Sequence, residues 1–112
     1  MAKHSADLDA MFAALAHPAR RAIVQRLTQG AASVSELAGP LPMALPTVIE
    51  HLHALQTAGL VRSEKRGRVR TCRLDGAKLK AAQSWLDEQR ALWEARTDSL
   101  EDFLQSRRDL DG

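Results

Sequence analysis

The residues in this 112-residue chain with the clearest chemical potential are the basic side chains that follow Gly59. Between Arg62 and Arg73 there are six basic residues and one acid, Glu64, so this stretch carries a net charge of +5. That density is well above the usual mixture on a soluble surface. It indicates contact with phosphates. A solvated edge hairpin, whose charges prevent pairing with other sheets, is the alternative.

The spacing of this basic stretch predicts a β-hairpin. Side chains alternate with a period of two before and after Arg66 and Gly67, and the glycine suits the turn. On such a hairpin, basic side chains could hold a nucleic-acid backbone or reach into a minor groove. The candidates are Lys65, Arg66, Arg68 and Arg70.

The preceding segment, from Pro46 to Gly59, predicts a helix. Proline suits the first turn of a helix and glycine the position after its end. Val48, Leu52 and Leu55 form one apolar stripe for a core, which leaves the other faces for a partner. The candidates for reading bases in a major groove are Pro46, Thr47, Ile49, Glu50 and His53.

Two side chains of that helix could contact bases, but for one of them another role is favoured. Ile49 could contact a thymine methyl group, and Glu50 could accept a hydrogen bond from a cytosine amino group. Glu50 would also repel phosphates, so a solvated carboxylate or one paired with an arginine is favoured. His51, three residues after Val48, is expected to be a half-buried packing residue.

Three shorter helices are predicted before this one. Leu8, Met11, Phe12 and Leu15 give a helical stripe over residues 6–16, and a second helix runs from Pro18 towards Gly30. Ser33 and Glu36 have the spacing of a capping box at the start of a third, which Gly39 and Pro40 end. The third and fourth helices therefore form a helix-turn-helix with a long, proline-rich break.

The C-terminal segment predicts one long helix, from an N-cap at Asp75 to about Arg108. Some 30 residues would span roughly 45 Å, more than a small domain needs for its own core. Its apolar residues form a loose seam, which favours a homodimer; packing of Trp85 and Trp93 within one chain is the alternative. The predicted interface comprises Leu8, Phe12, Trp85, Leu86, Trp93, Leu100 and Phe103.

Length and charge indicate one domain over residues 1–112, with a core and hairpin at 6–74 and a dimerisation helix at 75–108. Residues 1–84 have a net charge of +6 and residues 85–112 of −4, which predicts an anionic partner for the first part. The single cysteine, Cys72, favours a reducing compartment such as the cytoplasm. A membrane span or signal peptide is not expected.

Catalytic and metal chemistry are not expected from this sequence. There is no phosphate-binding glycine loop, defensible catalytic constellation or set of metal ligands at usable spacing, so no cofactor is predicted. A redox role for Cys72 stays open, although strand cysteines without activation are usually inert. A different class of function also stays open: a protein-interaction adaptor that uses the long acidic helix.

Four segments together resemble the ArsR/SmtB family of bacterial winged helix-turn-helix regulators: LAHPARRAIVQRL (15–27), SVSELA (33–38), LPTVIEHLHALQTAGLV (45–61) and GRVRTCRL (67–74). The resemblance implies a mainly α winged fold with four helices, a hairpin and a long C-terminal helix. It also implies a homodimer that binds double-stranded operator DNA and usually represses. The tail from Trp85 to Leu104 is similar to that of a branch without a metal site, and the effector is not implied.

Overall fold

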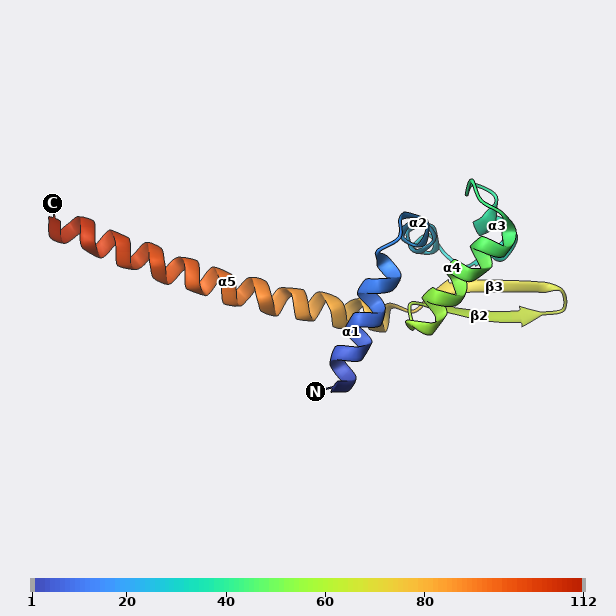
Figure 1. The fold of residues 1–112 in the computed structure, drawn as a ribbon, viewed down its shortest axis with the longest axis horizontal. Coiled ribbons are helices and arrows are strands. Elements are labelled where there is room, and N and C mark those ends of the chain that lie inside the picture. Colours follow the sequence, from blue (N-terminus) through green and yellow to red (C-terminus); the bar gives the residue numbers. More distant parts are fainter. Residues whose placement is uncertain (1, 112) are drawn as a thin grey trace. The chain divides into compact units, whose positions relative to one another are not determined.

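The computed structural model describes residues 2–111, with side chains described over 6–110. The chain forms two compact units, one ending at Ala81 and the other beginning at Ala82. The first contains α1 (Ala2–Leu15), α2 (Pro18–Leu27), β1 (Ala32–Ser33), α3 (Val34–Ala38), α4 (Leu45–Thr57), β2 (Val61–Arg66), β3 (Val69–Leu74) and the start of α5 (Gly76–Asp111). The second is the remainder of α5 (Figure 1).

The first unit is a small helical cluster with a three-stranded antiparallel sheet. Helices α1, α2 and α4 contact one another, and α4 lies beside the β2–β3 hairpin (Figure 1). The core includes Met11 of α1, Ile23 of α2 and the predicted stripe Val48, Leu52 and Leu55 of α4, all buried. Burying these side chains supplies the main favourable term in folding, since the gain scales with the apolar area removed from water.

The sheet has the order β1-β3-β2, so β3 is its central strand. Val61 pairs with Leu74 and Arg66 with Val69, which leaves Gly67 and Arg68 to make the turn. Gly67 has φ +60°, a conformation that glycine adopts without steric cost. The predicted hairpin is therefore confirmed, with its turn where the glycine indicated.

Strand β1 is the element that sequence patterning did not indicate. Its two residues pair with β3, Ala32 opposite Cys72 and Ser33 opposite Thr71. A strand of two residues cannot show a period of two, and its partner lies about forty positions along the chain. The predicted order of four helices, a hairpin and a long helix otherwise matches the structure, although α1 begins at Ala2, before residue 6.

The end of α4 fixes where the hairpin begins. Gly59 has φ +80° and follows Ala58, the C-cap residue of the helix. The N–H of Leu60 donates to the carbonyl of Leu55 at 3.0 Å, and the N–H of Gly59 donates to that of Gln56 at 3.0 Å. This is the Schellman arrangement, in which a left-handed residue satisfies the last helix carbonyls. Leu55 and Leu60 are both fully buried, so the chain leaves the helix directly into the core.

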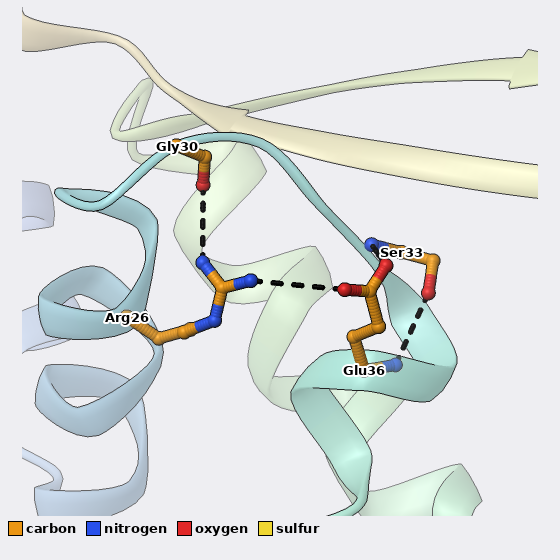
Figure 2. A network of polar contacts seen from close by, with 4 residues as sticks. All are labelled: Arg26, Gly30, Ser33 and Glu36. Atoms are coloured by element: carbon orange, nitrogen blue, oxygen red, sulfur yellow. Dashed lines mark hydrogen bonds and ion pairs between the residues drawn. The ribbon is translucent and has the colours of Figure 1, made fainter.

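The start of α3 carries the capping box (Figure 2). The N–H of Glu36 donates to Ser33 Oγ at 3.1 Å, and the N–H of Ser33 donates to Glu36 Oε1 at 3.1 Å. Arg26 of α2 lies 3.7 Å from Glu36 Oε2 and donates to the carbonyl of Gly30 at 3.3 Å. The cap therefore connects the end of α2 to the first helix of the helix-turn-helix.

The capping carboxylate should make stability depend on pH. The Ser33 backbone N–H, then the Ser33 hydroxyl and the charge of Arg26, hold the pKa of Glu36 below its ordinary value. A carboxyl whose folded-state pKa is lowered adds stability above its unfolded pKa, about 4.3, and loses it as pH falls through the folded value. We expect Glu36→Gln to lower the denaturation midpoint at pH 7 and to have a much smaller effect at about pH 3.

Urea denaturation of both proteins across this pH range measures the effect. Ser35→Ala is the matched control, because Ser35 is an exposed neighbour on α3 that is not part of the capping box. A difference between wild type and Glu36→Gln that stays constant from pH 7 to about 3 would contradict the assignment.

Helix α5 begins with the expected N-cap. Asp75 Oδ1 accepts a hydrogen bond from the N–H of Ala77 at 3.1 Å, while Asp75 Oδ2 lies 2.7 Å from Arg62 Nε. The backbone N–H of Asp75 donates to the Leu60 carbonyl at 2.8 Å. These contacts hold the pKa of Asp75 below its ordinary value, the Ala77 hydrogen bond first and the Arg62 contact second. The base of the hairpin and the first turn of α5 are thereby joined.

Candidate nucleic-acid interface

Helix α4 presents a polar and partly apolar face next to its buried stripe. Of the five residues predicted to read bases, Pro46, Ile49, Glu50 and His53 are exposed and Thr47 is half-buried. The same helix buries Val48, Leu52 and Leu55, which fixes its rotation about its own axis. The structure therefore brings these five residues together on one helix, and their contacts with bases stay a prediction.

For Glu50 and His51 of α4, the structure can be compared with the expectation from the sequence. Glu50 is exposed and has no ion-pair partner within the described part of the chain, so it is the solvated carboxylate. His51 is half-buried, as predicted, and its Nδ1 accepts a hydrogen bond from Arg20 Nε at 3.1 Å. The His17 ring lies 5.9 Å from that of His51. His51 therefore joins α2 to α4.

The hairpin carries the four predicted basic side chains on one continuous element. Lys65 and Arg66 end β2, Arg68 lies in the turn, and Arg70 lies on β3; all four are exposed. Over residues 6–110, no hydrogen-bond or ion-pair partner is found for the side chain of Lys65 or of Arg68. These two charges are available to an external anion without breaking an internal contact.

The other guanidinium groups of the hairpin have internal partners. Glu64 lies 3.4 Å from Arg66 Nε and 3.2 Å from Arg73 Nη2, so one carboxylate is shared by two arginines. Because the side chains are exposed, these pairs contribute little to stability and can exchange for contacts with another anion. The basic side chains of the hairpin therefore differ in how far their charge is offset by internal contacts. Among the described residues, the charges of Lys65 and Arg68 are the least offset.

A polar network joins α4 to the hairpin, and the sequence reasoning did not identify it. The Ser63 hydroxyl oxygen accepts hydrogen bonds from Gln56 Nε2 of α4 and from Arg70 Nη1 of β3, the latter at 2.9 Å. The spacing of residues in the sequence could have indicated this network. Gln56 follows the buried Leu52 by four residues, and Ser63 follows the buried Val61 by two. Both spacings place a side chain on the inward face of its element.

The residues predicted to form a dimer interface lie on α1 and α5. Leu8 of α1 is half-buried and Phe12 is 39% exposed. On α5, Trp93 is 66% exposed, and the other predicted interface residues of this helix are exposed as well: Trp85, Leu86, Leu100 and Phe103. Leu86, Trp93 and Leu100 are spaced seven residues apart, which places them on one side of the helix. Their role in an interface stays a prediction.

Metal ligands are not gathered within the described residues, where no group of three His, Cys, Asp or Glu side chains could hold an ion. Cys72, on the central strand, is fully buried. Burial raises the pKa of its thiol, and the nearby charge of Arg70 acts in the opposite direction. No helix among residues 2–111 is both long and apolar enough to cross a membrane.

Comparisons with known proteins agree with this geometry. A family model described as a helix-turn-helix domain matches residues 15–64, which span α2, α3, α4 and the start of the hairpin. The chain is 44% identical over 79 residues to the HTH-type transcriptional regulator Rv2034 of Mycobacterium tuberculosis, covering 70% of this chain and 74% of that protein. It is 35% identical over 65 residues to the biofilm growth-associated repressor of Agrobacterium fabrum, covering 58% and 56% respectively.

A comparison with solved structures identifies the family. The crystal structure of an ArsR family transcriptional regulator matches with a TM-score of 0.78 and 48% sequence identity, over 80% of this chain and 93% of that one. The likeness therefore extends beyond the helix-turn-helix to most of the chain. The protein belongs to the ArsR family of winged helix-turn-helix, DNA-binding transcriptional regulators.

Proposed function

We propose that this regulator is a homodimeric repressor that binds a palindromic operator in double-stranded DNA. The observation that carries the proposal is the pairing of an exposed face on α4 with the basic β2–β3 hairpin in one compact unit. In winged helix-turn-helix proteins, a helix enters the major groove while basic side chains contact the phosphates. The relative from Agrobacterium fabrum is a repressor by name, which supports repression as the direction of control.

The roles of the individual residues follow from their exposure and charge. On α4, Thr47, Ile49 and His53 would contact base edges or methyl groups, with Pro46 at the start of the helix and Glu50 next to the bases. On the hairpin, the wing of this fold, Lys65 and Arg68 would bind phosphates directly. Arg66 and Arg70 would join them by exchanging their internal partners, Glu64 and Ser63, for the DNA backbone.

The homodimer would form mainly through α5, with help from α1. The division of labour then follows the chain, with DNA contacts from residues 6–74 and self-association from residues 75–108. Two copies of α4 would enter successive major grooves, with half-sites about 34 Å apart. Binding near a promoter would block polymerase. We infer no catalytic activity and no cofactor, and we place the protein in the cytoplasm, where a bacterial operator lies.

Titration against DNA tests the proposal directly. The purified protein is titrated by fluorescence anisotropy against the DNA upstream of its own gene, with nonspecific competitor, at two salt concentrations. Tight, competitor-resistant and salt-sensitive binding is the expected result, because neutralised phosphates release counterions. Absence of binding at low salt would contradict the proposal and favour a protein-interaction adaptor, whose partner would meet the acidic α5.

Loss of one wing charge should weaken binding to every DNA sequence alike. We expect Arg68→Ala to lower affinity for operator and nonspecific DNA by a similar factor, and to reduce the slope of log K against log salt by about 0.9. Arg68 has no internal partner among the described side chains, so folding should be unaffected. The measurement is anisotropy over a salt series.

The matched control removes one charge elsewhere. Lys80 is an exposed residue near the start of α5, at the end of the hairpin opposite its turn, so Lys80→Ala should leave the slope unchanged. A wild-type slope in Arg68→Ala would rule out a phosphate contact by this side chain.

A further inference from the structure

A groove of about 470 Å³ lies between α4 and the hairpin, within the first compact unit. Its apolar part is formed by Val34 of α3, Ile49 and Leu52 of α4, and Cys72 of β3, of which Leu52 and Cys72 are buried. Lys65, Arg68 and Arg70 line it from the hairpin. The size lies within the range of small-molecule sites, about 300 to 1,000 Å³.

The positive charge of the side chains that line this groove favours an anionic ligand. Three of its lining side chains are cationic, and none of the carboxylates in the described part of the chain lines it. The carboxylate of Glu64 does not line it and is already shared by Arg66 and Arg73. Lys65 and Arg68 lack internal partners within the described residues, so their charge can be used fully by a ligand. A phosphate alone would contact these cations but leave the apolar part of the groove uncovered.

The groove also touches the network that joins the two elements. Gln56 and Arg70 both line the groove, and both donate hydrogen bonds to Ser63 Oγ. A ligand that binds Arg70 would compete with this contact and would sit against both the helix and the wing. Its presence would therefore affect two elements at once, through side chains that the same ligand contacts.

We propose that this groove binds a small organic anion with an apolar body, such as an aromatic carboxylate, and that the bound anion competes with DNA. The carboxylate lies against Arg70 and Arg68, and the ring lies against Leu52, Ile49 and Cys72. The competition rests on the proposed DNA-binding function, because the same cations then serve both partners. Binding of the anion itself does not depend on that function.

The probe is naphthalene-2-carboxylate, titrated into the ¹⁵N-labelled full chain at constant ionic strength and followed by amide chemical shifts. We expect saturable shifts confined to α4 and the β2–β3 hairpin. Inorganic phosphate, which lacks the apolar body, and 2-naphthalenemethanol, which lacks the charge, should each bind at least tenfold more weakly. Arg70→Ala and Arg68→Ala should each weaken naphthoate binding about tenfold, as expected for loss of a charge-assisted hydrogen bond. Lys80→Ala should leave it unchanged.

Three results would overturn the ligand site: no saturable shifts up to about 10 mM naphthoate, equal binding of naphthoate and inorganic phosphate, or shifts centred outside the groove. Competition is measured separately by anisotropy with nonspecific DNA at fixed ionic strength. A fall in DNA affinity that follows naphthoate occupancy is expected. Naphthoate bound in the groove with unchanged DNA affinity would overturn competition alone, and a protein that binds naphthoate but no DNA would refute the proposed function alone.

Discussion

Replacing Leu100 by glutamate is expected to separate the proposed homodimer into monomers. Leu100 lies on the same side of α5 as Leu86 and Trp93, and it is 57% exposed in the single chain. A charge placed in an apolar interface removes a packing contact and leaves a carboxylate without a partner. Loss of one well-packed contact of this kind costs about 2 kcal/mol or more, which raises the dimer dissociation constant roughly 30-fold or more.

Two measurements follow this change. Sedimentation velocity over a range of protein concentrations reports the monomer fraction, and anisotropy with a two-half-site operator reports the effect on DNA binding. A dimer binds its second half-site at a high effective concentration, so we expect operator affinity to fall roughly a hundredfold or more. Binding of the variant to a single half-site should change little.

The matched control adds the same charge on a different side of the helix. Ala91 is exposed and lies two residues before Trp93, so it points about 200° around the helix from it. Ala91→Glu should therefore keep the dimer and its operator affinity. If Leu100→Glu sediments as the wild type does, the α5 interface is wrong.

Replacing Leu55 by alanine is expected to cause the largest loss of stability among single truncations of α4. Leu55 is fully buried, it follows Leu52 on the inward stripe, and its carbonyl accepts the hydrogen bond that ends the helix. Removing its branched end leaves a cavity as well as losing buried apolar area. The free energy of unfolding should fall by about 2 to 5 kcal/mol, a large part of the 5 to 15 kcal/mol typical of a domain.

Urea denaturation at one fixed protein concentration measures this effect, since self-association would add to apparent stability. The denaturation midpoint should fall, while the slope of the free energy of unfolding against urea concentration stays the same. Ile49→Ala is the control on the same helix, because Ile49 is 50% exposed and should cost little stability. An unchanged midpoint for Leu55→Ala would show that the residue is not in the core as described.

The ends of the elements were predictable because local chemistry determines them. Pro18 and Pro46 mark the starts of helices, Gly59 and Gly67 take the positive φ values that turns require, and Ser33 caps α3. Each of these depends on a few neighbouring residues. A helix boundary or turn can therefore be inferred without knowing what packs against it.

The finer arrangement of the site depends on contacts between distant segments. The net charge of the hairpin followed from counting residues. Counting could not show that Glu64 is shared by Arg66 and Arg73, while Arg68 has no such partner among the side chains of residues 6–110. Likewise, the Gln56 and Ser63 contact requires the end of α4 to lie against β2. Such pairings are decided by tertiary packing, which residue spacing alone does not specify.

The position of the one cysteine makes the chain suited to a particular kind of measurement. Cys72 is fully buried on the central strand, opposite Ala32 on one side and Ser63 on the other. A thiol reagent reaches it only when the side chains that cover this face of the sheet move apart, and burial also raises the pKa of the thiol, which slows its reaction. Its labelling rate therefore reports how often the packing around the central strand opens. Because the chain has no second cysteine, that rate can be read in the native protein without an engineered probe.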